Sequence, residues 1–204
     1  MKVVVFSDTH GMHNKINIPD GDVLIFCGDF SKNGNERDLI SFNMFLGKQP
    51  HKNKIVIAGN HDFCLEDNIS AFAFLTNAIY LKDEEIVIDG IKFYGSPYTP
   101  NFGHWAFMLD KKKLKRKWNN IPNDVDVLIT HGPPYGKLDI TMSGSLAGCK
   151  ELDKRVKNLK PKYHVFGHIH EGYGEMKDKN TNYINASICD FHYKSINKPI
   201  VFEI

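Results

Sequence analysis

The sequence lacks the features that assign a chain to a membrane, secreted or disulfide-rich class. No stretch of its 204 residues approaches the ~20 apolar residues of a membrane span, so no membrane partner is expected. The apolar run at residues 3–6 is too short for the core of a signal peptide, which favours a cytoplasmic location. The four cysteines form no CxxC pair, so reduced thiols are expected rather than a disulfide framework.

An excess of one charge is also missing, because 26 Lys+Arg stand against 24 Asp+Glu and give a net charge of +2. Hydrophobic residues make up 42% and charged residues 25% of the chain, which excludes a disordered or collagen-like protein. A chain of this length buries roughly 70% of its unfolded surface. We therefore expect one domain over residues 1–204, and the composition leaves its oligomeric state open. Histidine is the abundant residue, with 10 copies.

Short apolar runs that end at polar or glycine-containing turns predict buried β-strands. The five clearest runs are residues 3–6, 23–27, 55–58, 127–129 and 163–166. Helical spacing of apolar residues predicts helices over residues 35–46 and 146–159, and Asp89-Gly90 predicts a hairpin within residues 85–94. Residues 183–188 and 200–204 are typical of further strands. The pattern predicts an α/β fold with a mixed sheet or a pair of sheets.

Each of the five predicted strands is followed by residues that can bind a metal ion. Ligands of α/β sheets bind beyond the carboxyl ends of strands, so these residues can meet in space although they lie far apart in the sequence. Two carboxylates, one amide and five imidazoles suit Mn, Fe, Co, Ni or Zn better than Ca or Mg. The set is too large for one ion, whereas two ions sharing a carboxylate would use all of it. Its members are Asp8, His10, Asp29, Asn60, His61, His131, His168 and His170.

Each motif alone has a structural explanation. The segment Asp8-Thr9-His10 is typical of a turn, and Asp62 either orients His61 or caps the next helix, of which the cap is favoured. All five motifs in this order, each after an apolar strand, favour a metal site over a purely structural role. His104-Trp105 and Tyr173 could stack on a base, but packing is the favoured explanation for these aromatic residues.

Together the motifs resemble the five-part signature of the calcineurin-like metallophosphoesterases. The matching residues are Asp8-x-His10, Gly28-Asp29, Gly59-Asn60-His61-Asp62, His131 and Gly167-His168-x-His170. Residues 95–100, 130–134 and 164–174 are similar to the small metallophosphoesterase-domain-containing branch, which is class III phosphodiesterase-like. The resemblance covers nearly the whole chain. It implies a four-layer α/β/β/α sandwich of two mixed β-sheets flanked by helices, with two metal ions at one edge.

The resemblance also implies a role for each matching residue. The first metal ion would be held by Asp8, His10, Asp29 and His170. The second would be held by Asp29, Asn60, His131 and His168, with Asp29 as the bridge. Some members of the branch lack the equivalent of His168, so its presence here implies a complete second site. His61 would be a catalytic histidine outside both coordination shells.

The implied reaction is the hydrolysis of a phosphate ester. Two divalent ions roughly 3.5–4 Å apart would activate a bridging hydroxide for attack, and the imidazole of His61 would act as general acid. Manganese is the expected metal, with Fe, Zn, Co or Ni as alternatives. The expected substrate is a small phosphodiester, in particular a cyclic nucleotide. A nucleic-acid phosphatase or nuclease on the same site and a non-catalytic binding scaffold of the same fold remain as alternatives.

A run of basic residues at 111–117 carries six positive charges in seven residues. It is compatible with a nucleic-acid patch or with a solvated helix face. The solvated face is favoured, so nucleic acid is the less favoured partner.

Overall fold

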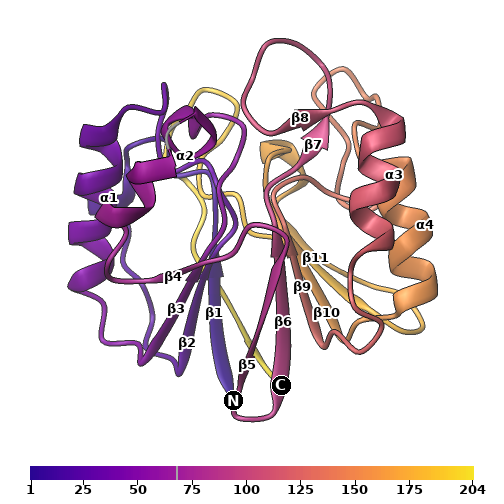
Figure 1. Cartoon of the computed structure of the whole chain (residues 1–204), viewed down its shortest axis with the longest axis horizontal. Helices are drawn as coiled ribbons and strands as arrows, with labels where there is room; N and C mark the ends of the chain where they lie inside the picture. The colour runs from indigo at the N-terminus through magenta and orange to yellow at the C-terminus, as the bar shows by residue number, and fades with distance from the viewer. Residues whose placement is uncertain (68) are drawn as a thin grey trace.

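Two β-sheets packed against each other form the centre of the molecule, and helices cover their outer faces (Figure 1). The computed structural model describes residues 1–67 and 69–204. Both sheets contain parallel and antiparallel pairs. The arrangement confirms the expected four-layer α/β/β/α sandwich of two mixed sheets. Within the described residues, no helix is long and apolar enough to cross a membrane.

The first sheet has the strand order β13-β1-β2-β3-β4. Its parallel strands are β1 (Lys2–Phe6), β2 (Val23–Phe26), β3 (Asn53–Val56) and β4 (Ile79–Tyr80). The last strand, β13 (Ile200–Glu203), pairs antiparallel with β1. All four residues of β2 are buried, as expected for a β-branched and aliphatic run covered on both faces.

The second sheet has the strand order β11-β12-β10-β9-β6-β5. These strands are β5 (Glu84–Ile88), β6 (Ile91–Ser96), β9 (Val127–Thr130), β10 (Tyr163–Phe166), β11 (Gly174–Lys177) and β12 (Asn182–Asn185). The predicted hairpin between β5 and β6 is confirmed, because Asp89 and Gly90 turn the chain with φ angles of 48° and 81°. Two short strands, β7 (Thr99–Pro100) and β8 (Met108–Leu109), pair with each other above this sheet (Figure 1).

Helices lie on the outer face of each sheet (Figure 1). The first sheet carries α1 (Glu36–Gly47) and α2 (Phe63–Asp67), and the second carries α3 (Lys111–Asn119) and α4 (Lys150–Leu159). The expected helix over residues 35–46 is confirmed, and the Asn35 side chain caps it by accepting a hydrogen bond from the backbone N–H of Asp38. Short 3₁₀-helices occur at η1 (His13–Lys15), η2 (Ile69–Phe74) and η3 (His170–Gly172).

The prediction of a helix from residue 146 was wrong at its beginning, because α4 begins at Lys150. The preceding residues are tied to another loop instead. The N–H of Ala147 donates to the carbonyl of Asp139, and the N–H of Cys149 donates to the carbonyl of Pro133. Cys149 is itself extended, with φ −79° and ψ 114°, and its sulfur accepts a hydrogen bond from the N–H of Leu152, so the helix begins only after it.

Three apolar layers hold the sandwich together. The layer between the sheets includes Val5, Ile25, Ile57, Val127, Ile129 and Val165. The layer under α1 is rich in phenylalanine and includes Phe6, Phe26, Phe30, Phe42 and Phe45. The layer under α3 and α4 includes Leu114, Trp118, Leu128, Leu152 and Val156. The carboxyl ends of β1, β2, β3, β9 and β10 are thereby held at one edge of the molecule.

Phe42 is fully buried in the centre of the phenylalanine-rich layer, with its ring 4.5 Å from that of Phe26 and 5.2 Å from that of Phe30. Phe42→Ala should lower the free energy of unfolding by about 3–5 kcal/mol, because it removes a large buried ring and leaves a cavity. Urea unfolding measures this loss. Met44→Ala in the same helix is the control: that side chain is 61% exposed, so its change should stay within about 0.5 kcal/mol. Similar losses for the two variants would contradict this account of the core.

Candidate metal centre

The loops that follow five strands converge at the carboxyl edge of the two sheets. Asp8 follows β1, Asp29 follows β2, Asn60 follows β3, His131 follows β9 and His168 follows β10. Backbone hydrogen bonds join the loops: the N–H of Asp8 donates to Gly28, and the N–H of Gly167 donates to His131. The structure thus brings together residues that lie up to 162 positions apart in the sequence, as Asp8 and His170 do.

Four of the predicted site residues occupy the left-handed region of backbone conformation. The φ angles are 52° at Asp8, 42° at His10, 64° at Asp29 and 70° at His168. Such a conformation costs on the order of 1–3 kcal/mol at a non-glycine residue, and it clusters at functional sites. The glycines of the motifs allow close approach here, because a Cβ atom at Gly167 would collide with Oδ2 of Asp8.

Hydrogen bonds to backbone carbonyls orient four of the imidazoles. The Nδ1 atom of His10 lies 3.1 Å from the oxygen of Ser31, and that of His61 lies 2.7 Å from the oxygen of Lys32. The same contact joins His131 to Cys27 at 2.8 Å and His170 to Asp190 at 2.9 Å. A carbonyl can only accept, so each Nδ1 carries the hydrogen. Each Nε2 is therefore turned towards the centre and is free to bind a metal ion.

Asp8, His10 and His170 form the first cluster of possible ligands. The Nε2 atoms of His10 and His170 lie 3.2 Å apart, and Nε2 of His170 lies 3.5 Å from Oδ1 of Asp8. Oδ1 of Asp8 is buried and has no hydrogen-bond partner in the described chain, whereas Oδ2 accepts from the His168 N–H and the Ser187 hydroxyl. Two nitrogens and an orphaned carboxylate oxygen facing one another fit a cation between them.

Asp29, His131 and His168 form a second cluster. Nε2 of His131 lies 2.9 Å from Oδ1 of Asn60 and 3.3 Å from Oδ2 of Asp29. The ring of His168 lies 4.9 Å from that of His131. Nitrogen and oxygen donors converge here as well, so the residues present fit a divalent ion of the transition series.

Asp29 lies between these two clusters, and with His10 and His61 it forms a third group of possible ligands. Its Oδ1 accepts a hydrogen bond of 2.8 Å from the backbone N–H of His61. Its Oδ2 lies 3.9 Å from Nε2 of His10, 4.0 Å from Nε2 of His61 and 3.3 Å from Nε2 of His131. One oxygen of this carboxylate therefore faces imidazoles of both clusters.

The electrostatics of the site attract positive charge. Burial opposes the ionisation of Asp8 and Asp29, yet neighbouring imidazoles, chiefly His170 and His131, hold the pKa of each carboxyl below its usual range. Burial by itself would lower the pKa of His131 and His170, but Asp29 and Asp8 raise these pKa values to about 9. When no metal ion is bound, protons on the imidazoles of His131 and His170 thus occupy positions that a metal cation can take.

Asp62 has a role that sequence reasoning missed. The favoured expectation of a helix cap is wrong, and its carboxylate joins two loops instead. It accepts hydrogen bonds from the backbone N–H groups of Asp29 at 2.8 Å, Gly59 at 2.8 Å and Ser31 at 3.3 Å. Asp62 is fully buried, so losing these bonds would leave its carboxyl oxygens without partners in the core. The position beside His61 in the motif was the only signal, and it did not reveal this long-range contact.

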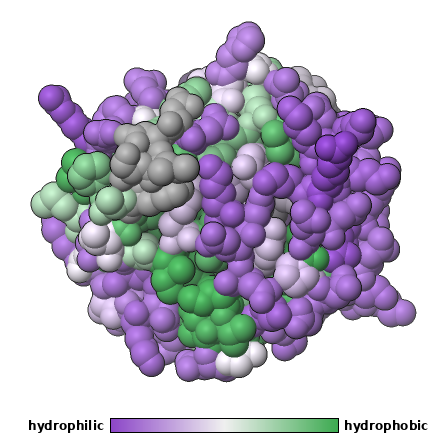
Figure 2. Space-filling view, in the orientation of Figure 1, coloured by the Kyte–Doolittle hydropathy of each residue, from purple (hydrophilic) through white to green (hydrophobic). Residues whose placement is uncertain are grey.

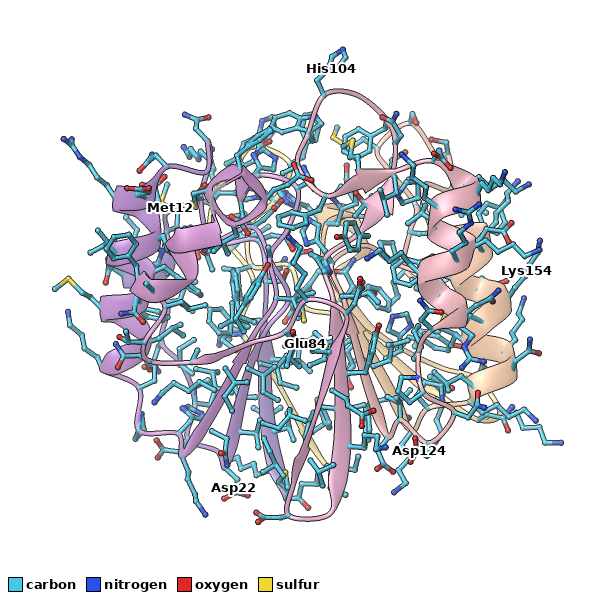
Figure 3. The ribbon with its side chains drawn as sticks, in the orientation of Figure 1. Met12, Asp22, Glu84, His104, Asp124 and Lys154 are labelled. Carbon is cyan, nitrogen blue, oxygen red and sulfur yellow. The ribbon has the colours of Figure 1, made fainter. Side chains whose placement is uncertain are left out.

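A cavity of about 910 Å³ opens over the centre and is lined by Asp29, Asn60, His61, His168 and His170. Four aromatic residues also line it: Phe102, Trp105, Phe191 and Tyr193. Trp105 was expected to be a packing residue, but it is 39% exposed in this cavity. His104 points away from the body of the molecule at the tip of the loop (Figure 3). Tyr173 packs against the core between the sheets, as expected.

The basic run lies on α3, and the cavity-lining residues include none of residues 111–117, all of which the structure describes. The outer side around α3 and α4 is almost entirely hydrophilic (Figure 2), and Lys111 is 82% exposed. The run is not a uniform solvated face, however. Lys117 contacts the carboxylate of Asp83 and lies over the Tyr98 ring, while Leu114 packs into the core.

Comparison with known proteins identifies the family to which this site belongs. The family model described as calcineurin-like phosphoesterase matches residues 1–172. The chain belongs to this family. This calcineurin-like phosphoesterase is therefore a metal-dependent phosphoester hydrolase, and its family implies divalent metal ions at the centre described above.

The sequence similarity to known proteins covers the whole chain. The human Metallophosphoesterase domain-containing protein 1 is 42% identical, over 100% of this chain and 71% of that protein. A UPF0046 protein of Caenorhabditis elegans is 40% identical, over 100% of this chain and 75% of that protein. A solved structure with 19% identity has a TM-score of 0.69, over 90% of this chain and 89% of the other, and shares the fold.

Manganese should raise the thermal unfolding midpoint of the metal-stripped phosphoesterase, because a cation satisfies donors that the folded chain holds together. A free ligand at 100 times its Kd adds about 2.7 kcal/mol to the stability of the folded state. Differential scanning calorimetry measures the shift, and a chelator should reverse it. His131→Ala should weaken the response, while His104→Ala, at an exposed loop tip, should respond as the unchanged protein does. An equal response from both variants would argue against the described cluster as the binding site.

Proposed function

We propose that this phosphoesterase hydrolyses small phosphodiesters, with cyclic nucleotides as the favoured substrates, at a centre of two metal ions. The observation that carries the proposal is the position of Asp29. Its Oδ2 atom faces imidazoles from both ligand clusters and lies 4.0 Å from Nε2 of His61. A bridging carboxylate and a nearby proton donor are the parts that a two-metal hydrolysis needs.

The two clusters suggest how the ligands divide. One ion would be held by Asp8, His10, Asp29 and His170. The other would be held by Asp29, Asn60, His131 and His168. When bound, divalent ions such as manganese supply positive charge to the phosphate oxygens and activate water. The neutral Asn60 amide completes the second set without adding negative charge, which keeps the centre attractive to an anionic ester.

His61 is placed to give a proton to the departing oxygen. Its Nδ1 donates to the carbonyl of Lys32, so a proton given to the substrate would come from Nε2 of the imidazolium form, in which both ring nitrogens carry a hydrogen. Nε2 is directed towards Asp29, and the side chain lines the cavity. The backbone N–H of His61 is itself bonded to Asp29. The backbone of His61 therefore holds its own imidazole at a fixed place relative to the carboxylate of Asp29.

The size of the cavity supports a diester. A volume of about 910 Å³ is at the upper end of the range for small-molecule sites and far exceeds the space that a phosphate group fills. An ester group can extend from the centre on each side of the phosphorus. The apolar and aromatic side chains around the opening suit organic substituents better than a second charged group.

Replacement of His61 tests the mechanism. His61→Ala should lower kcat on adenosine 3′,5′-cyclic phosphate by about 10²–10⁴-fold, because the ribose oxygen needs a proton as it leaves. The loss on bis(4-nitrophenyl) phosphate should be much smaller, since nitrophenolate leaves without help. Steady-state rates on both substrates, with metal analysis of both proteins, make the comparison. Equal losses on the two substrates with the metal content intact would exclude the general-acid role, and loss of metal would make His61 a ligand.

A further inference from the structure

We propose that Trp105 and Phe102 form the platform against which a flat aromatic group on the leaving alcohol of the substrate stacks. The inference rests on the proposed phosphodiesterase function and assigns residues that select its substrate. Both side chains lie in the loop between β7 and β8, which rises over the carboxyl edge of the second sheet (Figure 1).

The loop is fixed to the metal centre rather than free above it. The backbone N–H of Ala106 donates to the carbonyl of Asn60 at 3.0 Å, and the N–H of Phe107 donates to Oε1 of Glu66 at 2.6 Å. Ala106 and Phe107 are fully buried. The residue before this anchor is Trp105, so the ring is held at a defined place beside the candidate ligand Asn60.

Each of the two rings lies against an imidazole of the site. The Trp105 ring is 4.3 Å from that of His61, and the Phe102 ring is 5.3 Å from that of His168. Both rings line the cavity, where Trp105 stays 39% exposed and Phe102 stays 58% exposed. Large apolar surfaces left open inside a site favour a ligand that covers them.

The proton donor decides which part of the substrate reaches these rings. A leaving oxygen that takes a proton from Nε2 of His61 must come within about 2.6–3.2 Å of that atom. The group carried by this oxygen then lies beside the tryptophan that packs on His61. A nucleobase, which is flat, gains roughly 5- to 150-fold in affinity by stacking on such a side chain.

Tyr193, which also lines the cavity, is less suited to this role. Tyr193 lies 4.6 Å from the ring of His10, at an interplanar angle of 87°. It is 6.3 Å from the ring of His61 and meets it at 71°, whereas Trp105 is 4.3 Å away at 37°. The tryptophan is both closer to the proton donor and nearer to parallel with it, so we assign the platform to Trp105 and Phe102.

The kinetic test compares two diesters that differ only in the flat group. Adenosine 3′,5′-cyclic phosphate and methyl riboside 3′,5′-cyclic phosphate share the ring and the leaving oxygen, but the second carries a methoxy group in place of the base. We expect the unchanged enzyme to prefer the nucleotide in kcat/KM by roughly 5- to 150-fold. Trp105→Leu should bring this preference close to one, mainly by reducing turnover of the nucleotide, and Phe102→Leu should reduce it partly.

Phe191→Leu is the matched variant, because Phe191 is also an exposed aromatic residue of the cavity, 56% accessible, but comes from the segment between β12 and β13 and not from the loop between β7 and β8. It should retain the preference for the nucleotide. An equal loss on both substrates in Trp105→Leu would overturn the proposal and make Trp105 a positioning residue for His61. If Phe191→Leu lost the preference for the nucleotide and Trp105→Leu kept it, the platform would be Phe191 and not Trp105.

A binding measurement separates the platform from the reaction. The chain has two tryptophans, and the other, Trp118, lies on the buried face of α3 and is only 1% exposed. Adenosine 5′-monophosphate should therefore quench the fluorescence of the manganese-loaded enzyme, ribose 5-phosphate should not, and Trp105→Leu should abolish the quench. Quenching without hydrolysis of any diester would support the platform and refute the proposed function. Hydrolysis of diesters without quenching or base preference would refute the platform and leave the function standing.

Discussion

The site depends on one carboxylate, that of Asp29, being held between two groups of imidazoles. Asp29 lies in a left-handed backbone conformation at the end of β2, and three contacts hold it there. Its N–H donates to Asp62, its Oδ1 accepts from the backbone of His61, and Gly59 lies so close that a Cβ atom would collide with it. Without these restraints the carboxylate would relax, and the two clusters would no longer share an oxygen.

The arrangement of strands in the two sheets supplies these restraints. Parallel strands from both sheets end at the same edge, so that every loop at that edge can contribute a side chain at a short distance from its buried strand. The carbonyl oxygens of the loops also orient the histidines, because four Nδ1 atoms bond to backbone oxygens near the strand ends. The aromatic loop between β7 and β8 is then joined to Asn60, which connects this side of the cavity to the candidate ligands.

Local sequence patterns predicted the buried strands, the hairpin at Asp89-Gly90 and the residues that meet at the edge. They could do so because a β-branched run followed by glycine and a polar residue identifies a strand end without knowledge of its neighbours. The same patterns failed for Asp62 and for the beginning of α4. The partners of Asp62 include Asp29, 33 residues earlier, and the segment before α4 bonds to the loop at Asp139. The exposure of Trp105 likewise depends on how a loop is seated over other elements, which no local pattern contains.

Anomalous scattering from crystals of the protein grown with manganese tests the central claim most directly. The account predicts two peaks that both contact the carboxylate of Asp29. One should lie among Asp8, His10 and His170, and the other among Asn60, His131 and His168. A single fully occupied peak, or two peaks of which one does not touch Asp29, would contradict the bridging role on which the proposed mechanism is built.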